Sequence, residues 1–163
     1  MASALIVGCG CRGRELGTEL TGLGWQVRGT SRRADGIEAI EAAGIEPAEA
    51  DPDRPGTVLE LCGDVAVVVW LLGSASGAPE AVSAIHGPRL ERLLEKIVDT
   101  PVRGFAYEAT GSVDGELLDD GRRIVDRAAE TWRIPVTFLT SERDEPGRAA
   151  ATAGSIASLL TVF

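Results

Sequence analysis

Short apolar runs alternate with amphipathic segments along the whole chain of 163 residues. The apolar runs are rich in β-branched residues and have the length of strands. They predict strands over 4–7, 25–29, 45–50, 65–72, 102–107 and 135–139. Segments with helical spacing lie between them, at 14–23, 35–43, 88–98 and 116–132, with Asp35 as the expected cap of the second helix. This alternation is typical of βαβ units, in which each helix returns the chain to a parallel neighbour.

The run at 65–72 is apolar on both faces, as a central parallel strand should be. We therefore predict an α/β fold with one domain over residues 1–163. It is a doubly wound, parallel six-stranded sheet in the order 3-2-1-4-5-6, with helices on both faces. This length leaves no room for a separate substrate domain.

The last segment, 146–163, is rich in alanine and predicts a final helix. Its small-residue face consists of Ala149, Ala153, Ile156, Ala157 and Leu160. We favour closure of the monomer's own core by this face, because a single domain must cover its sheet first. A homodimer contact is the alternative.

Three glycines follow the first strand directly and open the first helix with the spacing G-x-G-x-x-G. Gly8 permits the tight turn, Gly10 lets a pyrophosphate approach the backbone, and Gly13 lets the helix pack closely on the sheet. Backbone N–H groups around Cys11 and Arg12, at the helix start, would hold the phosphates. The strand, loop and helix together predict a dinucleotide site of the Rossmann type; the alternative is a packing turn that binds nothing.

The end of the second strand is expected to meet the adenosine ribose of such a ligand, about twenty residues after the first glycine. Thr30, Ser31, Arg32 and Arg33 occupy this place, where an NAD site carries a carboxylate. Hydroxyl and guanidinium groups suit a 2′-phosphate, so we expect NADP(H) in preference to NAD. In the alternative interpretation, Arg32 and Arg33 are solvated loop charges.

Two other strand ends complete the predicted cofactor site. Asp51 follows the third strand and could accept a hydrogen bond from the adenine amino group, or could be a simple turn residue before Pro52. Leu72 and Gly73 end the fourth strand and are expected at the same edge of the sheet as the glycine loop.

Composition narrows the class of partner. The net charge of -9 and the lack of a basic stripe argue against nucleic acid. The sequence contains no run of about 18 apolar residues, as a membrane span requires, and no basic segment before Leu5, as a signal peptide requires. We therefore expect a cytoplasmic protein without a membrane partner. Three cysteines fit a reducing compartment.

The cysteines and the single histidine do not have the spacing of a zinc site, because Cys62 and His86 lie far from the Cys9 and Cys11 pair. We therefore predict no metal. Cys11, beside Arg12 at a helix start, is a candidate redox-sensitive thiol. The alternative is that Cys11 is a small residue that fills a tight loop and has no redox role.

With these residues the chain resembles the extended and atypical short-chain dehydrogenase/reductase family, in particular its small NAD(P)-binding, epimerase-like members. The likeness covers about 4–139 and is most specific at 8–17, 24–32 and 105–115. It implies the Rossmann fold and the nucleotide site. In that family a tyrosine acts as the acid/base, with a lysine four residues later.

The catalytic pair of that family is absent at the matching positions. Ala109 and Thr110 stand in place of the family's serine pair, Asp114 in place of the tyrosine, and Leu118 in place of the lysine. Thr110, Asp114 and His86 are the remaining candidates for chemistry. Each also has a structural interpretation: a strand-end hydroxyl, a turn former and a loop residue.

The sequence thus favours an NADP(H)-binding, short-chain-dehydrogenase-like module whose catalytic centre is missing or altered. The alternative is an NADP-dependent oxidoreductase, epimerase or dehydratase with atypical catalytic residues. A third hypothesis is an assembly partner of the same shape that binds no nucleotide.

Overall fold

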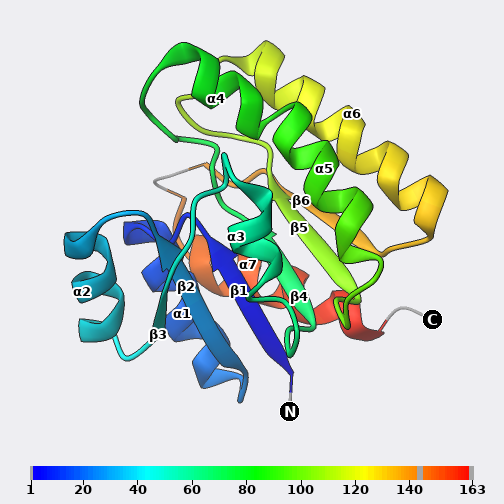
Figure 1. The fold of residues 1–163 in the computed structure, drawn as a ribbon. Helices are drawn as coiled ribbons and strands as arrows, with labels where there is room; N and C mark the ends of the chain where they lie inside the picture. The colour runs from blue at the N-terminus through cyan, green and yellow to red at the C-terminus, as the bar shows by residue number, and fades with distance from the viewer. Residues whose placement is uncertain (1, 143–144, 162–163) are drawn as a thin grey trace.

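The computed structural model describes residues 2–142 and 145–161, and its centre is one parallel sheet (Figure 1). The sheet has six strands in the order β3-β2-β1-β4-β5-β6, and every pairing is parallel. This confirms the predicted fold class and strand order. The strands are β1 (Ser3–Val7), β2 (Gln26–Ser31), β3 (Glu46–Glu49), β4 (Val67–Trp70), β5 (Gly104–Glu108) and β6 (Val136–Leu139).

Helices cover both faces of the sheet (Figure 1). One face carries α1 (Cys11–Gly22), α2 (Ala34–Ala42) and α7 (Arg148–Ser158), and a short 3-10 turn, Leu159–Thr161, follows α7. The other face carries α3 (Pro55–Leu59), α4 (Pro79–Ile85), α5 (Pro88–Ile97) and α6 (Gly115–Trp132). The doubly wound arrangement therefore places the carboxyl ends of all six strands at one edge.

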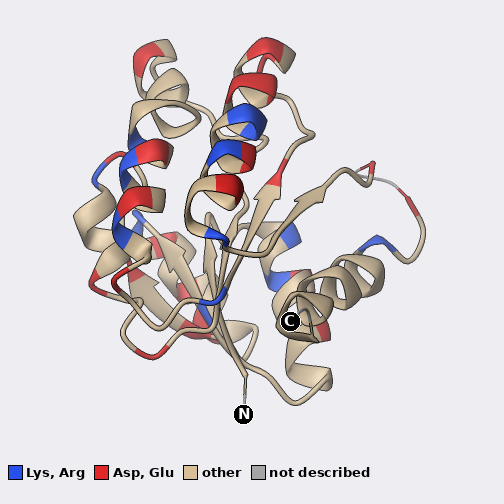
Figure 2. Cartoon of the chain, turned by 90° about the vertical axis from the view of Figure 1, so that its right-hand side faces the viewer, with Lys and Arg blue, Asp and Glu red and all other residues tan. Residues whose placement is uncertain are grey.

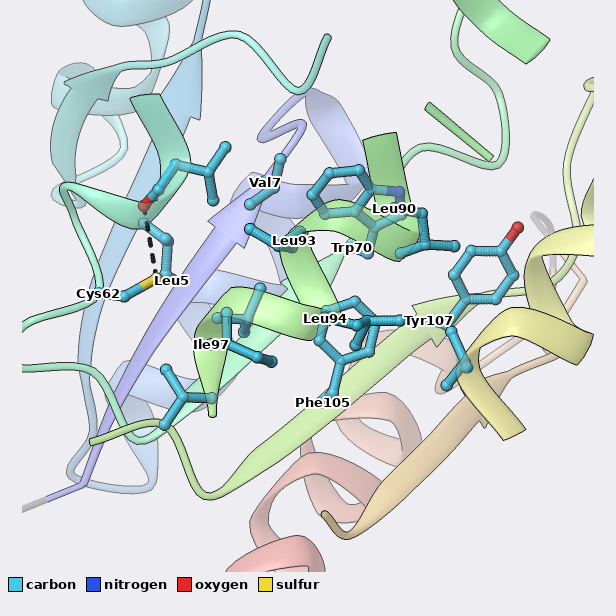
Figure 3. Close-up of a cluster of buried hydrophobic side chains, with 14 of the residues drawn as sticks. Leu5, Val7, Cys62, Trp70, Leu90, Leu93, Leu94, Ile97, Phe105 and Tyr107 are labelled. Atoms are coloured by element: carbon cyan, nitrogen blue, oxygen red, sulfur yellow. Dashed lines mark hydrogen bonds between the residues drawn. The ribbon is translucent and has the colours of Figure 1, made fainter. Parts of the chain in front are cut away.

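Two apolar clusters, one on each face, hold these layers together. On the α5 face, Leu90, Leu93 and Leu94 recur at helical spacing and are at most 1% exposed. Figure 3 shows these leucines beside the side chains of Trp70 and Phe105 from β4 and β5. Burial of side chains of this size contributes about 1.5–3 kcal/mol each.

The opposite cluster includes α7, whose Ala153 and Ile156 are buried against the sheet. This helix contacts α1 and closes the chain's own core, as its small-residue face predicts. Small alanine side chains allow the helix backbone to approach the sheet closely.

The structure corrects several predicted boundaries. Helix α1 begins at Cys11, three residues before the predicted Arg14, so Gly13 belongs to its first turn. Asp35 is not the cap of α2: Arg33 is the N-cap residue, and Asp35 accepts the Gly36 N–H (2.9 Å) within the first turn. Helices α3 and α4 were not predicted, because at 5 and 7 residues they are too short to show a helical period.

Charges lie mainly on the helices and loops, and Figure 2 shows acidic and basic residues alternating along α6. The strands β1 and β4 carry none, consistent with their burial on both faces. Among the described residues, no helix combines the length and the apolar character needed to cross a bilayer.

Candidate functional site: a cleft above the glycine loop

A cleft of about 510 Å³ opens at the carboxyl ends of β1, β2 and β4. Its size is within the range of ligand pockets. The start of α1 forms one wall, and the segment from Leu71 to Gly77 with one side of α4 forms the other. The predicted cofactor residues that line it are Gly8, Gly10, Cys11, Arg12, Gly13, Thr30, Ser31, Arg32, Arg33, Asp51 and Leu72. Gly73 does not line it.

The glycine loop has a backbone that requires glycine at its first position. Gly8 has a φ of +84°, and a Cβ there would lie 2.7 Å from the Leu71 carbonyl oxygen. Gly10 has open space where its Cβ would be. A ligand can therefore approach the backbone at Gly10 without meeting a side chain.

The hydrogen bonds of this loop leave donors at the helix start. The N–H of Cys9 donates to the Thr30 carbonyl (3.0 Å), and the N–H of Gly10 donates to the Gly8 carbonyl (2.9 Å). The first bond into α1 runs from the Arg14 N–H to the Gly10 carbonyl (2.9 Å). Among the described residues, the amides of positions 11–13 have no acceptor. They are donors at the positive end of a helix dipole, an arrangement that favours an anion.

Thr30 supports the glycine loop through a side-chain hydrogen bond. Its side chain is buried, and its hydroxyl accepts the Gly8 N–H at 3.3 Å. Thr30 therefore connects the end of β2 to the glycine loop, which makes it a support for the cleft floor.

The two arginines after β2 are exposed, and no ion pair involves them within the described part of the chain. Arg28, earlier on the same strand, is by contrast paired with Asp64 (3.2 Å) and Glu46 (3.3 Å). Ser31 accepts the Arg33 N–H at 3.1 Å, which holds this turn at the cleft. Arg32 and Arg33 thus bring unneutralised positive charge to this end of the cleft.

Asp51 lies at the far end of the cleft and forms a local turn. Its Oδ1 accepts the Asp53 N–H (2.9 Å), and its own N–H donates to the Thr57 hydroxyl (2.9 Å). These bonds match the turn interpretation and hold the carboxylate at the lining of the cleft.

A buried ion pair lies behind the cleft and was not foreseen from the sequence. Glu108, the last residue of β5, binds Arg12 through both carboxylate oxygens (2.9 and 3.1 Å). Glu108 also accepts the N–H of Gly73 at 2.6 Å, so this amide already has an acceptor within the protein. Burial raises the pKa of Glu108, and Arg12 opposes that rise. In the sequence, the one sign of this ion pair is that an acidic residue, Glu108, directly follows the apolar segment 102–107.

His86 is buried and does not line the cleft. Its Nε2 lies 2.9 Å from the Leu72 carbonyl oxygen, which only accepts, and its Nδ1 lies 2.6 Å from the Tyr107 hydroxyl. The proton therefore sits on Nε2, and Tyr107 donates to Nδ1. Burial lowers the pKa of His86 and raises the pKa of Tyr107. Both groups are neutral core residues.

The other two candidates for chemistry do not line the cleft either. Asp114 is the N-cap of α6, and its Oδ1 accepts the Glu116 N–H at 2.9 Å. The Thr110 hydroxyl donates to the Ser141 carbonyl at 3.4 Å. The three candidates are thus occupied in separate structural hydrogen bonds.

The cysteines also separate by environment. Cys9 and Cys62 are buried, and burial raises the pKa of each thiol to about 11. Cys11 is exposed at the cleft, with its Sγ 3.8 Å from Glu15. Within the residues that the structure describes, no three His, Cys, Asp or Glu side chains are grouped to hold a metal ion.

Fold and cleft together define a Rossmann-type α/β domain. No protein-family model and no curated protein matches the sequence. Solved structures do match its fold. UDP-glucuronic acid 4-epimerase from Bacillus cereus, in complex with NAD, matches with a TM-score of 0.69 at 18% identity, over 84% of this chain and 55% of that one.

Two further structures extend this comparison. Triphenylmethane reductase from Citrobacter sp., complexed with NADP(H), matches with a TM-score of 0.63 at 18% identity, over 85% of this chain and 49% of that one. A candidate NAD-dependent epimerase/dehydratase from Bacillus halodurans matches with a TM-score of 0.77 at 14% identity, over 99% of this chain and 91% of that one. The chain spans about half the length of the epimerase and the reductase. At these identities the likeness establishes the fold, in agreement with the resemblance read from the sequence.

Proposed function

We propose that this chain binds NADP(H) in the cleft above the glycine loop. The observation that carries the proposal is the pairing of free amides at positions 11–13 with unpaired Arg32 and Arg33 at opposite parts of one cleft. NADP(H) has anionic groups at both of the corresponding places, its pyrophosphate and its 2′-phosphate. The fold neighbours from Bacillus cereus and Citrobacter sp. were crystallised with NAD and NADP(H), which supports a nicotinamide dinucleotide as the ligand class.

The residues present fit this group. The open space at Gly10 admits the pyrophosphate to the backbone, where the amides of α1 donate to it. Ser31, Arg32 and Arg33 fit the 2′-phosphate that distinguishes NADP(H) from NAD(H). Asp51 and Pro52 would border the adenine. When bound, such a cofactor supplies a hydride acceptor or donor.

We further propose that the chain acts as a binding or regulatory module. The resemblance read from the sequence aligns Asp114 and Leu118 with the catalytic tyrosine and lysine of short-chain dehydrogenases. Asp114 caps α6, and Leu118 is buried within that helix. Tyr107 and His86 are hydrogen-bonded to each other in the core. The described lining of the cleft contains no tyrosine and no lysine, the residue types of the acid/base pair in that family.

The test of cofactor choice is the double substitution Arg32→Ala/Arg33→Ala, followed by calorimetric titration with NADPH and with NADH. We expect the Kd for NADPH to rise roughly 10–100-fold, because charge-assisted bonds to the phosphate are lost. The Kd for NADH should stay within about twofold, since NADH lacks that phosphate.

The matched control is Arg92→Ala/Arg127→Ala, which removes the same charge from exposed sites on α5 and α6. It should leave both Kd values unchanged. Equal affinity of the Arg32/Arg33 variant and the wild type for NADPH would refute the assignment. Steady oxidation of NADPH with a panel of carbonyl compounds would instead favour the oxidoreductase alternative.

A further inference from the structure

We infer that Glu108 is the residue that positions the two walls of the cleft, through its simultaneous bonds to Arg12 and Gly73; the link to cofactor affinity rests on the proposed NADP(H) function. Arg12 is the second residue of α1, in the wall that carries the free amides. Gly73 follows β4 and belongs to the segment that forms the other wall. Glu108 comes from neither wall.

The geometry makes this one connected unit. The Arg12 guanidinium contacts both oxygens of the carboxylate, so its orientation is fixed as well as its position. The Gly73 N–H is the third donor to the same group. The Glu108 and Arg12 side chains are 6% and 13% exposed. In so dry a place, loss of one charged partner leaves the other uncompensated, and the structure must shift to hydrate it.

The segment that contains Gly73 is held tightly on its other side too. A Cβ at Gly73 would overlap the Thr110 carbonyl and Glu108, and one at Gly111 would overlap the Gly73 carbonyl. The Val113 N–H donates to that same Gly73 carbonyl at 3.0 Å. The loops after β4 and β5 are therefore packed closely against each other, and the ion pair of Glu108 with Arg12 joins α1 to them.

Arg12 could in principle serve the ligand directly, by turning its guanidinium to a phosphate. The two roles predict opposite signs for one variant. If Arg12 is a ligand held back by Glu108, Glu108→Gln releases it and tightens NADPH binding. If Glu108 positions the walls, Glu108→Gln loosens them and weakens binding.

The test is a double-mutant cycle with Glu108→Gln, Arg12→Gln and the double variant, measured as NADPH Kd by calorimetry well below the melting temperature. We expect each single variant to raise the Kd roughly tenfold. The double variant should be no worse than either single one, because both act through the same pair. It also removes both buried charges, so it remains informative if a single variant does not fold.

The matched control is Glu19→Gln, which removes an exposed carboxylate of α1 outside the cleft. It should leave the NADPH Kd unchanged. A purely structural role for Glu108 would lower the melting temperature and leave the Kd unchanged, and would overturn the inference. Tighter binding by Glu108→Gln would overturn it as well.

Amide hydrogen exchange without any ligand separates this inference from the proposed function. Glu108→Gln should speed exchange at Gly73 and at Arg14, the first bonded amide of α1, and Glu19→Gln should not. If the wild type fails to bind NADPH but these amides exchange faster, the function proposal fails and the positioning role holds. Unchanged exchange at both amides contradicts the positioning role.

Discussion

At the scale of the residue, His86 connects three parts of the fold through one neutral imidazole. It lies at the end of α4, and its ring nitrogens contact Leu72, two residues after β4, and Tyr107 of β5. The hydroxyl of Tyr107 and the carbonyl of Leu72 suit only the tautomer with its proton on Nε2. If Nδ1 were protonated, its N–H and the Tyr107 O–H would be two donors facing each other, and the hydroxyl would have to rotate.

The folded protein should therefore lose stability as the pH falls below the ordinary pKa of histidine. Burial lowers the pKa of His86 in the folded state, so between that value and about 6.5 the unfolded chain binds more protons. The contribution is fully present above pH 6.5 and is lost as the pH falls toward the folded pKa. The slope is at most about 1.4 kcal/mol per pH unit.

Because the chain has one histidine, its ring signal in an NMR titration reports this group directly. The expected midpoint lies below 6.5, and a midpoint at or above that value would contradict the buried neutral assignment. Urea unfolding of wild type and His86→Gln over the same pH range gives the matching free energies. Glu108, whose pKa is raised by burial, contributes a slope of the opposite sign, and the comparison of variants removes it.

At the scale of the element, α6 approaches β5 closely at a single glycine. The Cβ of any larger residue at Gly121 would overlap the Tyr107 hydroxyl, which is already bonded to His86. Arg122, the next residue, lies over the ring of Phe138 at 4.5 Å from its centre. Gly121 is therefore the point where α6 has no room for a side chain, while Val125 and Ala128 of the same helix pack into the core.

Gly121→Ala should lower the free energy of unfolding by about 1–3 kcal/mol, because the added methyl group must displace Tyr107 or the helix. Gly115→Ala, in the first turn of the same helix, is the matched control, since nothing lies within 4 Å of its Cβ position. It should be neutral or stabilising by up to about 1 kcal/mol. Equal effects of the two substitutions in urea denaturation would argue against close packing at Gly121.

The sequence predicted elements well where a local pattern carries the physics. Apolar periodicity predicts all six strands and the helices α1, α2, α5 and α6. The roles of Gly8 and Gly10 follow from the backbone conformation that one turn requires. The short helices α3 and α4 have no full period to detect. The contacts of Arg12 with Glu108 were hidden for a different reason: these residues are 96 positions apart, and only the assembled sheet brings them together.

At the scale of the whole molecule, NADPH should raise the stability of the protein, because it binds the native state and not the unfolded chain. At a free NADPH concentration of about 100 times the Kd, the free energy of unfolding should rise by about 2.7 kcal/mol. For a chain of this length, that corresponds to a rise in melting temperature of roughly 5–10 °C. A thermal-shift panel of NADP, NADPH, NAD and NADH measures it, and NADPH should give a larger shift than NADH. No shift with any of the four would favour the assembly-partner hypothesis.

The different environments of the three cysteines make the molecule suitable for selective labelling. Cys9 and Cys62 are buried with raised pKa values, while Cys11, within the described residues, is the exposed thiol and lies in the cleft wall. A thiol-reactive fluorophore would therefore attach at one place in the unmodified chain. Its emission would report on the environment of the glycine loop, so occupancy of the cleft could be followed without engineering a label site.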